Sequence, residues 1–418
     1  AFILFKRTDS GDRWLMADNK RADALTNMDD FLDAQDSAPE GTFGATNGIN
    51  FLSNGFSINT TDGVLNANNG TYIYLAIAAD PDTTTPTVEN SFDVVTYTGN
   101  GGTQSIDTDF KPDLIWVKER TNASHHALFD SVRGNQYLLS SNQTIAEIDQ
   151  TANPALESFN TNGFTVDQTN TSNYYVNRSS QNYVAWCWKA GDHDDNLPQI
   201  NTEGSIDSVV SVNDEAGFSI VKYTGNGTQG ATVGHSLSSP PELIIWKNTD
   251  ATANWLVYSP LIGSDSEWLY LNATSSKQDS GSQNEYPTNK TNPTSDVVTI
   301  NGAGSSNNIN ISGESTIMYC FTSITGYQKV GSYTGTGVSG LDVSLSFSPR
   351  FLLVKGVGST GWILIDSQRG SKELYANLSD AEDASATAFV LGTNKFTVNS
   401  TGTWHNSYDV DYIYLAIK

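Results

Sequence analysis

The stretch Tyr183-Val-Ala-Trp-Cys-Trp188 says most about the fold. Alternate side chains of a strand point to opposite faces, so Tyr183, Ala185 and Cys187 share one face and the residues between them share the other. Both faces are apolar. A strand apolar on both faces is central, lying either between sheets or under a neighbour.

Related strands recur at intervals of roughly 100 residues, which is the signature of internal repeats. The aromatic strand returns at Tyr72–Ala76, Ile317–Phe321 and Tyr412–Ala416. An apolar strand ending in lysine occurs at Phe2–Lys6, Leu114–Lys118, Leu243–Lys247 and Phe351–Lys355. An opening strand ending in Tyr-Thr-Gly occurs at Phe92–Gly99, Phe218–Gly225 and Tyr327–Gly335.

These recurrences divide the chain into four tandem repeats, called repeats 1 to 4 below. Their expected limits are 1–80, 91–190, 217–325 and 326–418. Repeat 1 lacks the opening strand, which predicts an exposed sheet edge. We expect the missing strand to come from upstream residues of a longer chain or from a neighbouring subunit. Residues 80–86 and 190–216 are expected to be linkers.

The fold class predicted from this pattern is all-β. Short strands separated by regular turns indicate an antiparallel β-sandwich in each repeat, with a jelly roll as the favoured topology. A short helix is expected over residues 22–34. The four sandwiches are expected to follow one another in an elongated chain.

Composition sets limits on function. The chain has 418 residues, 46 acidic and 22 basic side chains, and a formal net charge of −24. This charge opposes binding to phosphate backbones, so no nucleic-acid partner is expected. No run reaches the ~20 apolar residues that a membrane-spanning helix needs, so no membrane insertion is expected.

The motifs of repeat 2 resemble a repeat found in virion-surface proteins of tailed bacteriophages, marine ones in particular. The resemblance rests on Tyr-Thr-Gly-Asn-Gly, Leu-Ile-Trp-Val-Lys, Phe-Asp-Ser-Val-Arg-Gly, Asn-Gly-Phe-Thr-Val and the aromatic strand, all between Tyr97 and Gly191. It fades in the other repeats. It implies a tail-fibre or other appended virion protein, with a sandwich similar to concanavalin A-like lectins, and it implies no catalytic residues.

An Asp-x-x-Arg pair recurs at one position in three repeats. The pairs are Asp18 with Arg21, Asp130 with Arg133, and Asp366 with Arg369. Repeat 3 has Ser259 and Ile262 there, so both partners are lost together. Joint loss favours a structural ion pair, because a partly buried charge left alone is costly. The alternative is an arginine fork that binds a carboxylate or an acidic sugar.

Other repeated residues also have a structural and a functional interpretation. The lysine that ends each apolar strand is expected to lie along the sheet with its ammonium in water. The alternative is a contact between repeats or chains. Trp14, Trp255 and Trp362, with His126 in repeat 2, are expected in the core or between repeats.

Trp268 and Trp404 have no equivalents in other repeats. We expect them near loops, where an exposed aromatic ring can stack on a sugar. They are the candidate glycan-binding residues. The acidic run from Asp192 to Asp195 could bind calcium, but it lacks the spacing of a calcium loop, and a solvated linker is favoured. No metal site and no cofactor are expected.

Signals for an enzyme are weak. The sequence has no Gly-x-Ser-x-Gly elbow, no phosphate-binding loop and no His-Glu-x-x-His motif. The expected function is therefore a non-enzymatic virion protein, in a tail fibre, spike or capsid decoration, that mediates assembly and attachment to a host surface. Expected partners are further copies, other virion proteins or a host glycan, at a virion-surface or extracellular location. The alternatives are a lectin-like adhesin and a secreted or cell-surface β-repeat protein of a bacterium.

Overall fold

The computed structural model describes most of the chain as antiparallel sheet. It describes residues 2–18, 30–35, 37–42, 48–52, 55–77, 90–167, 174–191, 199–264, 267–279, 288, 291–301 and 308–418. Within this part of the chain the only helix is α1 (Gly63–Asn66), where Asp62 accepts a hydrogen bond from the backbone N–H of Val64. The all-β expectation is confirmed. None of the described helices has the length and apolar character needed to cross a membrane.

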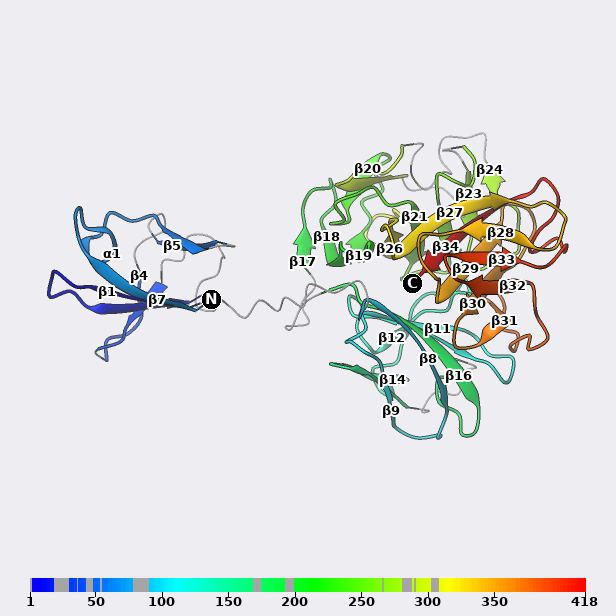
Figure 1. The fold of residues 1–418 in the computed structure, drawn as a ribbon, viewed down its shortest axis with the longest axis horizontal. Coiled ribbons are helices and arrows are strands. Elements are labelled where there is room, and N and C mark those ends of the chain that lie inside the picture. The colour runs from blue at the N-terminus through cyan, green and yellow to red at the C-terminus, as the bar shows by residue number, and fades with distance from the viewer. Residues whose placement is uncertain are drawn as a thin grey trace. The chain divides into compact units, whose positions relative to one another are not determined.

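The chain divides into two compact units, Ala1–Thr85 and Pro86–Lys418, called unit 1 and unit 2. Unit 1 corresponds to repeat 1. Unit 2 holds repeats 2, 3 and 4, whose strands gather in one body (Figure 1). The expected succession of separate repeats is therefore wrong for repeats 2 to 4, and the reason is a core that the three share.

Unit 1 has a five-stranded sheet in the order β4-β3-β2-β1-β7 and a hairpin of β5 and β6. Strand β7 is an edge strand, since no described strand takes the place of the opening strand. The expected helix over 22–34 is wrong in its described part, because Asp30–Asp33 pairs with β2 as strand β3. The strands are β1 (Phe2–Arg7), β2 (Trp14–Asp18), β3 (Asp30–Asp33), β4 (Gly41–Thr42), β5 (Ile49–Leu52), β6 (Gly55–Ile58) and β7 (Tyr72–Ile77).

Repeat 2 pairs its main strands in the order β11-β10-β16-β8, and a smaller sheet runs β14-β15-β9. Apolar residues of both sheets meet in one cluster, including Ile115, Ala185 and Phe164. The strands are β8 (Phe92–Thr98), β9 (Gln104–Asp107), β10 (Leu114–Glu119), β11 (Ala127–Asp130), β12 (Tyr137–Leu138), β13 (Ile148–Asp149), β14 (Leu156–Asn160), β15 (Gly163–Val166) and β16 (Asn182–Trp188).

Repeat 3 forms an eight-stranded sheet, β17-β18-β19-β26-β21-β22-β23-β24, and a two-stranded sheet, β20-β25. The expected linker 190–216 is wrong over its second half, because Ser208–Asn213 pairs along its whole length with β19. The strands are β17 (Gln199–Asn201), β18 (Ser208–Asn213), β19 (Phe218–Thr224), β20 (Ala231–Gly234), β21 (Leu243–Asn248), β22 (Leu256–Tyr258), β23 (Glu267–Tyr270), β24 (Gln278–Asp279), β25 (Val297–Ile300) and β26 (Ser315–Phe321).

Repeat 4 has a five-stranded sheet, β27-β34-β29-β30-β31, and a three-stranded sheet, β28-β33-β32. Its main strands follow the same neighbour order as in repeats 2 and 3: opening strand, aromatic strand, lysine strand, third strand. The strands are β27 (Gln328–Thr334), β28 (Leu341–Ser344), β29 (Phe351–Gly356), β30 (Trp362–Asp366), β31 (Gly370–Tyr375), β32 (Phe389–Gly392), β33 (Lys395–Val398) and β34 (Asp411–Ile417).

The aromatic strands β16, β26 and β34 each contribute to two cores. One face packs inside its own repeat, as Cys187 does in repeat 2 and Ala416 does in repeat 4. The opposite face joins a cluster drawn from all three repeats, to which Trp186, Tyr319 and Leu415 belong. The prediction of a strand buried on both faces is confirmed, and the covering neighbours are other repeats.

The Tyr-Thr-Gly motif fixes the loop that precedes each aromatic strand. The hydroxyls of Tyr97, Tyr223 and Tyr333 donate to backbone carbonyls of Val176, Ile309 and His405 at 2.6, 2.8 and 2.6 Å. The glycines that end the motif, Gly99, Gly225 and Gly335, lie against backbone oxygens, and a Cβ built there would approach within 2.0–2.4 Å of them. Glycine is required because the two backbone segments approach this closely.

Candidate functional site

The Asp-x-x-Arg residues form ion pairs in the interior of unit 2. Arg133 Nε lies 2.6 Å from Asp130 Oδ2, and Arg369 Nε lies 2.6 Å from Asp366 Oδ2, with all four side chains fully buried. Asp18 ends strand β2 in unit 1, and its partner Arg21 lies outside the described residues. Full burial leaves no room for the carboxylate of a ligand to reach Arg133 or Arg369.

Each of these carboxylates also accepts a hydrogen bond from the aromatic strand of another repeat. Tyr319 of β26 donates through Oη to Asp130 Oδ2 at 2.7 Å. Trp186 of β16 donates through Nε1 to Asp366 Oδ2 at 3.0 Å. The two donors stand at the same position of their strands, opposite Trp116 and Ile245 of the lysine strand. The ion pair therefore joins two repeats.

The third junction has lost both halves of this contact. Repeat 3 carries Ser259 and Ile262 where the other repeats have Asp and Arg. The aromatic strand of repeat 4 carries Leu415 at the donor position, opposite Leu353. Ile262 and Leu415 both belong to the shared core. A carboxylate without its donors is costly to bury. At this junction the Asp, the Arg and the donor are therefore all absent together, and apolar residues of the shared core stand at two of the three positions.

Nearby acidic groups keep Arg133 charged. Burial lowers the pKa of Arg133, but the nearby Asp130, Tyr319 and Glu147 outweigh burial and raise that pKa above its ordinary value. Burial, assisted by the charge of Asp130, raises the pKa of Tyr319 well above its usual range. The arginine therefore stays charged and the tyrosine stays protonated as a donor.

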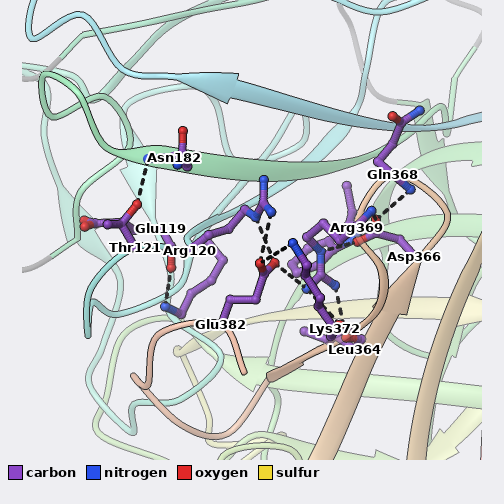
Figure 2. A network of polar contacts seen from close by, with 12 residues as sticks. Glu119, Arg120, Thr121, Asn182, Leu364, Asp366, Gln368, Arg369, Lys372 and Glu382 are labelled. Carbon is purple, nitrogen blue, oxygen red and sulfur yellow. Dashed lines mark hydrogen bonds and ion pairs between the residues drawn. The ribbon is translucent and has the colours of Figure 1, made fainter. Parts of the chain in front are cut away.

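A second carboxylate extends the pair toward the surface. Glu382 of repeat 4 accepts from Arg369 Nη1 at 3.2 Å and from Arg120 Nε of repeat 2 at 2.8 Å (Figure 2). Burial raises the pKa of Glu382, but the two arginines outweigh it and hold the pKa below its ordinary value. In repeat 2 the corresponding partner of Arg133 is Glu147, at 2.8 Å.

The repeated lysines of unit 2 do not reach water, so the expected solvated ammonium is wrong there. Lys118, Lys247 and Lys355 are fully buried. Lys247 Nζ donates to the carbonyl of Thr144 in repeat 2 at 3.2 Å, and Lys355 Nζ donates to the carbonyl of Ser275 in repeat 3 at 3.0 Å. The alternative, a contact between repeats, describes these two lysines.

Burial sets the charge state of the same lysines. It lowers the pKa of Lys118 and Lys247 to about 8 and that of Lys355 to about 7. The carbonyl oxygens around Lys355 compensate in part, since Nζ also donates to Gly358 and Thr360 at 3.0 and 2.7 Å. Such amines sit near the ionisation range of a general base. All three side chains are fully buried, however, and apart from a bond from Lys355 to the Thr360 hydroxyl they donate to backbone carbonyls.

The residues repeated with Trp14 also connect repeats. Trp255 Nε1 donates to the carbonyl of Ser140 at 2.8 Å, and Trp362 Nε1 donates to the carbonyl of Tyr270 at 2.9 Å. His126 holds the third position, with Nε2 at 2.9 Å from the carbonyl of Tyr375. Burial lowers the pKa of His126 well below its ordinary value, so the ring is neutral and donates through Nε2.

The two glycan candidates lie in different surroundings. Trp268 is 2% exposed and packs edge-on to Tyr270. No ring face is open to a sugar, so the stacking role expected of Trp268 is wrong. Trp404 is half-buried and packs edge-on to Tyr375. Tyr408, four residues further along the chain, is 79% exposed, and no sequence motif marked it as a candidate.

Other reactive groupings are scarce in the part of the chain that the structure describes. It holds no group of three or more His, Cys, Asp or Glu side chains placed to bind a metal ion. The acidic run Asp192–Asp195 lies outside the described residues. A small apolar cavity of about 20 Å³ lies where the three repeats meet, lined among others by Trp116, Tyr319 and Leu415. That volume holds at most one water molecule.

Comparison with known proteins identifies a family whose function is unknown. A family model described as "Domain of unknown function (DUF7483)" matches residues 1–81 and 88–418. The interruption falls at the boundary between units 1 and 2. No curated protein matches the chain.

Proposed function

The chain belongs to the DUF7483 family, and we propose that it is a non-enzymatic structural protein of a virus particle. Its proposed tasks are assembly of a tail fibre, spike or capsid decoration and attachment to the host surface. The proposal rests on how the repeats use their polar residues.

One observation carries the proposal. The repeated Asp, Arg and Lys side chains of unit 2 are buried and bond to other groups of the protein. Asp130 and Asp366 accept from a neighbouring repeat, and Lys247 and Lys355 donate to one. An enzyme keeps its reactive groups at a cleft where a substrate can reach them. Here the recurring groups hold repeats together, which supports a load-carrying or spacing role.

The proposed architecture is four β-sandwich repeats of the jelly-roll type. Support comes from the pairs of sheets that share a core in repeats 2, 3 and 4, each with its own apolar cluster. Unit 1 has the same kind of cluster around Ile3, Phe5 and Leu15. Repeats of one fold offer several similar surfaces, and the avidity of many weak contacts exceeds any single affinity.

The proposed location is the virion surface, with other copies or other virion proteins as partners. Support comes from the resemblance of the repeat motifs between Tyr97 and Gly191 to virion-surface proteins of tailed bacteriophages. The net charge of −24 adds to it by favouring solubility and opposing contact with the packaged nucleic acid. The same charge would suit a secreted bacterial protein, which is the alternative location.

Glycan binding is a secondary proposal. It rests on Trp404, because Trp268 is buried. The ring of Trp404 is half-buried and its neighbour His405 bonds to Glu373 at 3.0 Å. A glycan array probed with the chain and with Trp404→Ala tests this role. Sugar-dependent signal that the variant loses supports it, and equal signal from both proteins contradicts it.

Immunogold labelling of purified virus particles tests the main proposal. The antibody is raised against the chain, and preimmune serum is the control. We expect gold on the outside of intact particles, at regular positions and in several copies per particle. Unlabelled particles together with the chain in the cell wall or in the medium would contradict a virion role.

A further inference from the structure

Unit 1 presents an apolar sheet face. Ile73, Leu75 and Ile77 of β7 lie on it with 50%, 52% and 54% of their surface exposed. Beside them, in register, stand residues of β1 and β2 that are half-buried: Phe2, Leu4, Trp14 and Met16. The other face of the same strands carries the unit's own core, which includes Ile3 and Phe5. The exposed face is therefore separate from the core of unit 1.

Repeat 4 shows what this face does when it is covered. Strand β34 contains the hexapeptide of β7, Tyr-Ile-Tyr-Leu-Ala-Ile, as residues 412–417. Strand register matches the other positions one to one, and only Met16 differs, with Leu364 as its counterpart. The seven counterparts are exposed by 2% or less and all belong to the shared core: Phe351, Leu353, Trp362, Leu364, Ile413, Leu415 and Ile417.

One aromatic contact beneath the face also recurs in both places. Tyr74 meets Phe56 edge-on with ring centres 5.1 Å apart, and Tyr414 meets Phe396 edge-on at 5.1 Å. The core-side packing is looser in unit 1, where Tyr74 is 61% exposed against 5% for Tyr414. The outward faces of the two strands nevertheless present the same residues in the same register.

In unit 2 the covering is two further faces of the same type. Phe351 of repeat 4 contacts Trp188 of repeat 2 with ring centres 5.6 Å apart, and Trp188 contacts Phe218 of repeat 3 at 6.3 Å. All three faces are closed by one another, since their apolar residues are 5% exposed or less. Unit 2 thus has no open face of this type in its described part. The open one is in unit 1.

Two polar groups mark where a neighbour belongs. Trp14 and Lys6 of unit 1 hold the positions of Trp362 and Lys355, which pair with each other across β29 and β30. In unit 2 those two side chains donate to backbone carbonyls of a neighbouring repeat, at Tyr270 and Ser275. Lys6 Nζ meets the carbonyl of Asp12 within unit 1. A neighbouring copy would offer further carbonyls at these positions.

We propose that unit 1 is an assembly site whose apolar face packs against unit 1 of two further copies of this chain. The three faces enclose a common core, as repeats 2, 3 and 4 do within one chain. Leu75, like Leu415, brings no hydrogen-bond donor, so the centre of the contact between copies is apolar. Asp18 stands where the apolar junction has Ser259, and it keeps the partner that it has within its own chain. The interface is independent of where the protein works, so its test does not depend on a virion.

Sedimentation of the full chain tests the proposal. The unaltered protein is expected to approach three times 45.2 kDa as its concentration rises. Leu75→Asp places a charge at the centre of the face and is expected to raise the midpoint of association at least tenfold. The matched control is Val338→Asp, because Val338 is an apolar residue of unit 2 that is 66% exposed and lies off the face. Its association should equal that of the unaltered chain.

The outcomes separate clearly. A monomer at every concentration, or a species that stops at two copies, would overturn the proposal. Trimers that Leu75→Asp leaves intact would show that another surface joins the copies, which also overturns it. The unaltered chain carries the test of association by itself, so a folding defect in the variant cannot hide the answer. Near-ultraviolet circular dichroism of the variant checks its fold.

Discussion

The carboxylate of Asp130 lies among donors from two repeats, with Arg133 at 2.6 Å and Tyr319 at 2.7 Å. At the junction of repeats 3 and 4 the corresponding residues are Ser259, Ile262 and Leu415, all of them unable to form that pair. The chain thus contains a polar and an apolar solution to the same junction. What it avoids is a buried charge with a missing partner.

Exchanging one solution for the other gives a prediction. Asp130→Ser alone removes the acceptor that Arg133 Nε and Tyr319 share, while Arg133 keeps Glu147 and two backbone carbonyls as partners. It should lower the free energy of unfolding of unit 2 by about 3 kcal/mol, the lower end for a broken buried pair. Adding Arg133→Ile and Tyr319→Leu copies the apolar junction and should recover part of that loss. Denaturant unfolding followed by tryptophan fluorescence measures both. A triple variant no more stable than Asp130→Ser would contradict this account of the junction.

Lys355 predicts a pH dependence of stability. Burial lowers its pKa to about 7 in the folded chain, against 10.5 as its ordinary value. Between these values the unfolded chain holds a proton that the folded chain does not, so stability rises with pH, by up to about 1.4 kcal/mol per pH unit. Relative to Lys355→Met, the unaltered chain should therefore gain stability from pH 7 to pH 10. A difference that is constant over that range would refute the buried neutral amine.

At this scale the repeated residues could be identified from the sequence, but the surroundings of some of them could not. The joint loss of Asp and Arg in repeat 3 indicated a structural pair, and the structure brings Asp130 to Arg133 and Asp366 to Arg369. The lysines were expected in water because a lysine that ends an apolar strand usually reaches solvent. The loops that cover Lys247 and Lys355 come from other repeats, and the sequence around each lysine does not indicate this covering.

Among the elements, strands β7 and β34 share one hexapeptide and differ in their surroundings. Leu75 is 52% exposed, and Leu415 is 2% exposed. Because its side chains are apolar on both faces, such a strand is predicted to be buried on both sides. The pattern does not name the partner, which is supplied by tertiary packing in unit 2 and, by our proposal, by other copies in unit 1.

The Tyr-Thr-Gly motif gives a prediction at the scale of the element. A Cβ on Gly225 would lie 2.4 Å from the carbonyl oxygen of Ile311, so Gly225→Ala must displace the loop before β26. We expect a loss of about 1–3 kcal/mol in the free energy of unfolding. Gly358→Ala is the control, because a Cβ there meets nothing within 4 Å. Equal stability of the two variants in denaturant unfolding would show that the close approach is not the reason for the glycine.

For the whole molecule, the repeats could be read from the sequence but their association could not. Recurring strands located repeats 2 to 4, yet the structure merges them around one cluster that includes Trp186, Tyr319 and Leu415. Sequence separation hides such contacts, because each face is apolar for reasons that a sandwich core would equally explain. Strand β18 (residues 208–213) was expected to be linker for a related reason. It pairs with the outer side of the opening strand β19, where the described part of the other repeats has no counterpart.

The central claim is that repeats 2, 3 and 4 are one cooperative body, and calorimetric unfolding of the full chain tests it most directly. The account predicts that Pro86–Lys418 unfolds in a single transition, separate from that of unit 1, with equal calorimetric and van't Hoff enthalpies. The shared core requires this, since opening one repeat exposes the faces of the other two. Three separable transitions within unit 2 would contradict the claim.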